Sequence, residues 1–157
     1  MIELLEVVES SGFSMFLKES STIYVLTLAL HAIGLAFAVG ISIATALRVL
    51  GVAPGLPLIA MEPFFPLMYL GLWITLLSGL FLTIMYPLDY FTDGTIYVKL
   101  VFVVVAVVMI KKLNAELFSD MADIDSPVIT RRARMDSILI IVSWIIVITA
   151  GRIMAYT

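Results

Sequence analysis

The sequence predicts an all-α integral membrane protein: a four-helix transmembrane bundle preceded by a short amphipathic N-terminal segment. Apolar residues make up 62% of the 157 residues, well above the roughly half that is usual in soluble domains. Long stretches contain no charged residue, and Gly, Pro or charged residues mark the connections between them. The chain length is that of a single compact unit.

Residues 1–21 are the first predicted element, an amphipathic segment. Acidic residues there alternate with Leu5, Val8, Phe13 and Phe16, a pattern typical of a short helix that lies on the membrane surface. Because this stretch contains glutamates rather than a basic run, we expect no cleavable signal peptide.

Residues 22–157 are predicted to form the membrane domain, because a spanning helix needs about 20 mostly apolar residues. The first two helices contain no charge at their centres, and the third is interrupted only by Lys99 near its start. A lysine in that position can extend its ammonium group to the membrane interface. Arg152 lies near the end of the fourth helix. The predicted helices span residues 22–48, 63–88, 96–115 and 137–156.

The connections are predicted as a turn-rich loop at 50–62, a short turn at 89–94 and a polar loop at 116–136. With four spans, the first and third connections share one side of the membrane. That side holds Arg48, Lys111, Lys112, Arg131, Arg132 and Arg134, and the other holds Lys18, Lys99 and Arg152. The positive-inside rule then places both termini outside the cytoplasm.

Several classes of function are excluded by composition. Cysteine is absent, which excludes disulfides, thiolate metal sites and covalent c-type haem attachment. The net charge of −3, together with the lack of any basic stretch outside one short loop, argues against nucleic-acid binding. No serine has a histidine and an acid at matching depth, so a hydrolytic enzyme is not supported. We expect a protein that is not an enzyme by itself.

His31 is the centre of the one polar constellation in the predicted membrane region. It lies about 12 Å below the outer end of its helix at 1.5 Å per residue, on the side where Lys99 and Arg152 end up. An imidazole between two cations suits an anionic cofactor or substrate. In the alternative interpretation, Asp89 and Asp93 in the adjacent turn supply the counter-charge.

Small and hydroxyl-bearing residues recur on the helix face that includes His31. This stripe consists of Thr27, His31, Gly34, Ala38, Ser42 and Thr45, and the second helix offers Gly71, Thr75, Ser78 and Gly79. Such stripes commonly let two membrane helices pack closely. A sharper interpretation is that Gly34, one turn from His31, leaves room for a flat ring system.

As the only histidine, His31 cannot belong to a site built from several imidazoles of one chain. It is a candidate metal ligand for b-type haem, in which case the second axial ligand is a methionine, a residue of another chain, or absent. Met85 and Met154 are the methionines on that side. His31 is equally a candidate hydrogen-bond partner of a quinone, or a simple bridge between helices.

Several short motifs resemble an uncharacterised family of small bacterial four-helix membrane proteins. That family is distantly similar to copper-resistance D-type proteins and to membrane proteins thought to bind b-type haem. The motifs are Phe16 to Ser20, Leu30 to Gly34, Leu47 to Gly51, Leu77 to Gly79 and Ala150 to Arg152. The resemblance implies a multi-pass protein of the bacterial inner membrane, whose termini would then be periplasmic.

Two functions follow from these observations. The first is a membrane-embedded cofactor-binding subunit for electron transfer, holding b-type haem or a quinone with His31, Gly34, Lys99 and Arg152. The second is a non-catalytic structural or accessory subunit of a larger membrane complex. Expected partners are the lipid bilayer and either other membrane subunits or a second copy of the chain, but no nucleic acid.

Overall fold

The computed structural model describes residues 2–118 and 129–154, and these residues form helices without any strand. The prediction of an all-α chain is confirmed for them. A 3-10 helix, Leu58–Phe64, leads into α4. The helices are α1 (Ile2–Glu9), α2 (Gly12–Glu19), α3 (Ser21–Val49), α4 (Phe65–Met85), α5 (Pro87–Thr92), α6 (Thr95–Phe118) and α7 (Arg131–Ile153).

Three helical segments are long and apolar enough to cross a membrane. They are Ser21–Val49, Leu58–Met85 and Arg131–Ile153. The predicted third span corresponds to α6, which is not among them because every 18-residue stretch of α6 includes at least three charged residues. Three spans are therefore shown by length and composition, and the fourth stays a prediction.

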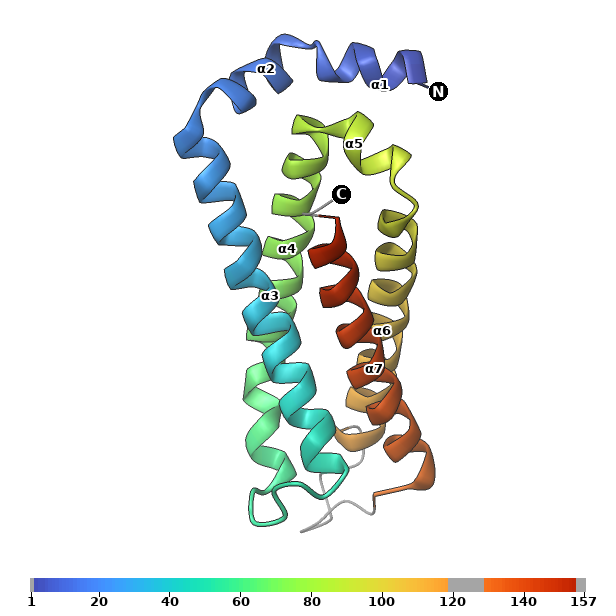
Figure 1. The fold of residues 1–157 in the computed structure, drawn as a ribbon. Helices are drawn as coiled ribbons and strands as arrows, with labels where there is room; N and C mark the ends of the chain where they lie inside the picture. Colours follow the sequence, from blue (N-terminus) through green and yellow to red (C-terminus); the bar gives the residue numbers. More distant parts are fainter. Residues whose placement is uncertain (1, 119–128, 155–157) are drawn as a thin grey trace.

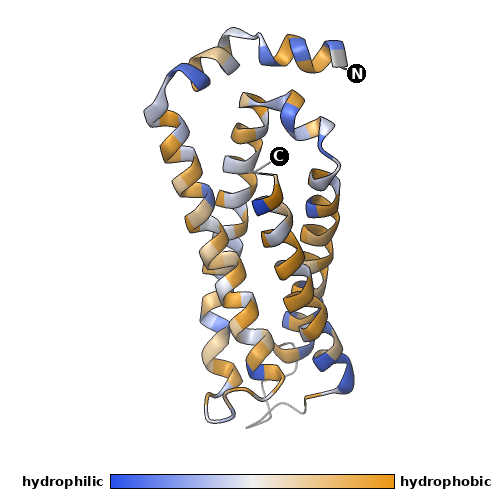
Figure 2. Cartoon of the chain, in the orientation of Figure 1, coloured by the Kyte–Doolittle hydropathy of each residue, from blue (hydrophilic) through white to orange (hydrophobic). Residues whose placement is uncertain are grey.

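The four long helices run side by side, while α1 and α2 lie across one end (Figure 1). Two pairs pack most extensively, α3 with α4 and α6 with α7, and α3 joins the pairs through α7. At the end covered by α1 and α2, helix α3 begins, α4 ends, α6 begins and α7 ends; we call it the α5 end (Figure 1). Apolar residues extend along all four long helices (Figure 2).

The N-terminal segment forms two helices rather than one. Helix α1 ends at Glu9, and Ser11 caps α2, since its hydroxyl oxygen accepts a hydrogen bond from the Ser14 amide at 3.2 Å. The buried Ser14 hydroxyl donates to the carbonyl of Ile84 at 3.0 Å, and the Lys18 ammonium lies 4.9 Å from the Tyr86 ring centroid. These contacts fix α2 against the α5 end.

The last helix begins at Arg131 rather than at Ser137. The Thr130 side chain caps it by accepting from the amide of Ala133 at 3.0 Å and donates a hydrogen bond to the Glu116 carboxylate. Asp136 therefore lies inside α7, only 7% exposed, and not at the end of a loop. The predicted polar loop 116–136 is correspondingly shorter, and its residues 119–128 lie outside the described part.

The second predicted helix, 63–88, is interrupted near its end. Helix α4 ends at Met85, and Pro87 begins the separate helix α5 because proline cannot donate the amide hydrogen that would continue α4. The predicted turn 89–94 is therefore mostly helical. Helix α6 follows after Asp93, whose carboxylate accepts from the Thr95 amide at 2.8 Å and the Thr95 hydroxyl at 2.6 Å.

Candidate functional site

A cavity of about 920 Å³ lies at the α5 end, within the size range of roughly 300–1,000 Å³ typical of ligand pockets. Five helices, α3 to α7, contribute residues to its lining. The ionisable side chains among its described residues, tyrosines aside, are His31, Asp89, Asp93, Lys99 and Arg152. The cavity thus collects polar groups from helices that are far apart in the sequence.

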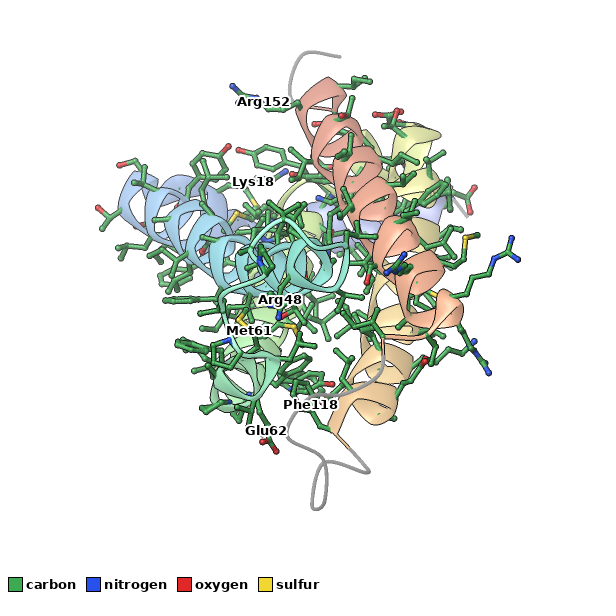
Figure 3. All side chains as sticks on the ribbon, turned by 90° about the horizontal axis from the view of Figure 1, so that it is seen from below. Lys18, Arg48, Met61, Glu62, Phe118 and Arg152 are labelled. Carbon is green, nitrogen blue, oxygen red and sulfur yellow. The ribbon has the colours of Figure 1, made fainter. Side chains whose placement is uncertain are left out.

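Three of the four predicted site residues line this one cavity: His31 from α3, Lys99 from α6 and Arg152 from α7. Arg152 is exposed and extends outward from the last turn of α7 (Figure 3). The convergence expected from helix directions is present in the structure. It places one imidazole and two cations around the same space.

Gly34, the fourth predicted residue, lies in the contact between α3 and α4 and does not line the cavity. A Cβ atom at Gly34 would lie 2.8 Å from the carbonyl oxygen of Gly71 and 2.5 Å from Thr75 Oγ1. The reciprocal contact holds too, since a Cβ at Gly71 would lie 2.8 Å from the carbonyl oxygen of Gly34. Gly34 therefore serves close helix packing here, not space for a ring.

The imidazole of His31 lies against residues of α4. Its Nδ1 atom lies 3.0 Å from Ser78 Oγ, and the Ser78 hydroxyl also lies 2.6 Å from the carbonyl oxygen of Ile74. The ring lies against Gly79, where a Cβ atom would be 3.1 Å from His31 Cε1. The ring also makes a hydrogen-bond contact with the backbone of Thr75. Within the described residues, no side chain forms a hydrogen bond with Nε2.

The Lys99 side chain packs against Gly151 of α7, as the His31 ring packs against Gly79 of α4. A Cβ at Gly151 would be 3.6 Å from the Lys99 ammonium nitrogen and 3.8 Å from its Cε atom. The ammonium is near enough to act electrostatically on His31. Among residues 2–118 and 129–154, no carboxylate lies within 4.0 Å of it. Lys99 therefore lines the cavity without a direct ion pair to any carboxylate of the described residues.

Two carboxylates share the cavity with these cations. Asp93 uses its carboxylate to begin α6, and Asp89 is exposed on α5. The formal charges of Asp89, Asp93, Lys99 and Arg152 cancel. All four side chains line the same cavity, and the alternative in which the two aspartates supply the counter-charge stays a prediction.

Three tyrosines also line the cavity: Tyr24, Tyr86 and Tyr90. The rings of Tyr24 and Tyr86 meet edge-on with centroids 6.3 Å apart. Burial raises the pKa of Tyr90, and Tyr24, Asp89 and Tyr86 beside it act in the same direction. The sequence pattern did not identify these side chains as part of the site. The available signal was their shared position near the helix ends that form the α5 end.

The two candidate methionine ligands, Met85 and Met154, differ in whether they line the cavity. Met85 is fully buried in a small core with Leu17 and Leu82, outside the cavity, whereas Met154 lines it. If a metal ligand besides His31 is to come from a methionine of the described lining, it is Met154.

Comparison of the chain with protein-family models, with curated proteins and with solved structures finds no match.

Proposed function

We propose that the chain is a membrane-embedded subunit that binds a redox cofactor, b-type haem or a quinone, in the cavity at the α5 end and takes part in electron transfer. One observation supports this most directly: His31, Lys99 and Arg152 come from three different helices and line one ligand-sized cavity. Ionisable side chains within membrane helices are rare and usually functional.

Both cofactors fit the residues present. With Nδ1 held by Ser78, Nε2 of His31 would be available as an axial iron ligand or as the acceptor of a hydrogen bond from a ring hydroxyl of a quinone in its reduced form. Lys99 and Arg152 would stabilise negative charge on propionates or on a reduced ring. A bound haem or quinone would supply the one-electron chemistry, which no side chain here provides.

The membrane arrangement that goes with this function has four spans, with α6 as the fourth. Its flanking charges, Lys99 at one end and Lys111, Lys112 and Glu116 at the other, leave an apolar centre between them. The three cations at the α5 end against six at the opposite end favour a periplasmic position for that end in a bacterial inner membrane. The cavity would then open toward the periplasmic side.

The alternative is a non-catalytic accessory subunit of a larger membrane complex or a homo-oligomer. It is favoured by the contact between Gly34 and Gly71, which shows that the small-residue stripes already have a structural role in joining α3 to α4. In that case the exposed apolar faces of α4 and α6, at Trp73 and Val104 for example, would contact other subunits as well as lipid.

Visible absorption spectra of the detergent-purified protein, oxidised and then dithionite-reduced, combined with quinone extraction, test the proposal. We expect either a Soret band with a reduced α-band or a co-purifying quinone, and its loss in His31→Ala. Ser42→Ala is the matched control, because among the described residues the Ser42 hydroxyl forms hydrogen bonds only within α3. Absence of both cofactors from the native protein, or retention of the cofactor in His31→Ala, would contradict the proposal.

A further inference from the structure

The hydrogen bonds around Ser78 determine which nitrogen of His31 carries a proton. A serine hydroxyl has one hydrogen to donate and accepts with its lone pairs. Its shortest contact is the 2.6 Å one to the Ile74 carbonyl, an atom that can only accept, so the hydroxyl hydrogen is used there. The Ser78 oxygen must then accept from His31 Nδ1 at 3.0 Å. The neutral imidazole therefore has Nδ1–H and an unprotonated Nε2.

An unprotonated Nε2 and a nearby ammonium group place opposite demands on a ligand. Nε2 needs a hydrogen-bond donor or a metal, while Lys99 needs an acceptor. A ring hydroxyl meets both demands, because it donates one hydrogen and accepts on the same oxygen. A quinone carbonyl meets only the demand of Lys99.

The charge of the cavity favours a neutral ligand. Asp89 and Asp93 balance Lys99 and Arg152, so a ligand with two negative groups, such as haem with its propionates, would compete with the carboxylates already present. The lining also includes Leu28, which is 47% exposed on the outer face of α3. That face offers a path by which an apolar tail could extend into lipid.

We infer that this cavity selects the hydroquinone form of a lipid-soluble quinone, with one ring hydroxyl placed between His31 Nε2 and the Lys99 ammonium group. Ser78 and Gly79 are positioning residues, because they hold the imidazole in the tautomer and orientation that accept the hydroxyl. The inference rests on the proposed function, of which it chooses one cofactor class and one redox state.

Binding of decyl-ubiquinol and decyl-ubiquinone to the full-length protein in detergent, measured by calorimetry, tests the inference. We expect the quinol to bind about tenfold more tightly, the effect of one additional good hydrogen bond. For a two-electron couple, this preference raises the midpoint potential of the bound quinone by about 30 mV. Equal affinities, or tighter binding of the quinone, would overturn the inference.

Variants assign the preference to the residues named. His31→Ala should abolish the preference for quinol while the helical circular dichroism is unchanged, and Ser78→Ala should reduce it because the imidazole is no longer fixed. Ser42→Ala should behave as the native protein. A quinol preference that survives in His31→Ala would contradict the assigned contact.

Nitrogen NMR of labelled His31 gives a readout that does not depend on any bound cofactor. We expect Nδ1 to be protonated and Nε2 unprotonated in the ligand-free protein, with a shift of the Nε2 signal when quinol is added. A protonated Nε2 would overturn the tautomer assignment. A Soret band with no affinity for quinol would overturn this inference and leave the electron-transfer proposal intact, whereas the absence of haem and of any quinone or quinol binding would overturn both.

Discussion

The contact between α3 and α4 makes a sharp prediction about Gly34→Ala. The added Cβ would lie 2.5 Å from Thr75 Oγ1 and 2.8 Å from both the Gly71 carbonyl oxygen and the Thr75 amide nitrogen. Two of these atoms belong to the backbone, so the helices themselves must separate. Such overpacking costs about 1–3 kcal/mol, while replacing glycine by alanine in a helix returns about 0.5–1 kcal/mol. We therefore expect a net destabilisation of roughly 1–2 kcal/mol.

Gly40→Ala is the matched control, because it lies on the same helix and a Cβ there would meet nothing within 4 Å. It should be neutral or stabilising by up to about 1 kcal/mol. Both variants share the helix-propensity gain, so the difference between their free energies of unfolding isolates the packing cost. The assay is reversible unfolding in mixed micelles with increasing SDS, followed by circular dichroism. Equal effects of the two substitutions would refute the close contact between α3 and α4.

Three further predictions concern Tyr90, Trp144 and Gly151. Because burial raises the pKa of Tyr90 above its usual value of about 10, the folded state holds this proton more tightly than the unfolded chain. The contribution of Tyr90 to stability is complete below pH about 10 and is lost as the pH rises through the folded-state pKa. Phenolate absorbance and the fall of the unfolding free energy at alkaline pH should both show this loss in the native protein. Neither should show it in Tyr90→Phe. Trp144 is buried and its indole N–H has no partner within the described residues, so Trp144→Phe should change the unfolding free energy by less than about 1 kcal/mol, against a loss of about 3–5 kcal/mol for Trp144→Ala. A Cβ at Gly151 makes only an ordinary contact with Lys99, so Gly151→Ala should bind quinol as the native protein does, whereas Gly151→Leu should displace the ammonium group and weaken binding about tenfold.

The sequence was sufficient to predict features that depend on polarity over a whole helix. Charge-free runs located three segments that are long and apolar enough to span a membrane. Counting helices then placed His31, Lys99 and Arg152 at one end, and the structure brings them to one cavity. Helix direction accounts for this convergence, because residues near the same end of neighbouring antiparallel helices share a level.

Features that depend on individual contacts could not be predicted in the same way. The start of α7 was missed because Arg131, Arg132 and Arg134 suggest a solvated loop, whereas the Thr130 cap and its bond to Glu116 begin the helix earlier. The role of Gly34 required the helix crossing point, since a small residue is compatible with a ring pocket or a close contact. The link between Ser78 and His31 joins residues 47 positions apart, and no local pattern indicates such a pair.

The cavity itself results from places where side-chain volume is missing or the helix is broken. Pro87 ends α4 early, so the chain turns across the end of the bundle instead of filling it. Gly79 gives the His31 ring a surface to lie against, and Gly151 does the same for the Lys99 side chain. Larger residues at these two glycines would displace the very groups that line the space. The same substitutions that would pack this end more densely are therefore expected to remove its capacity to bind a ligand, so ligand affinity should fall more sharply than stability when Gly79 or Gly151 is replaced by leucine.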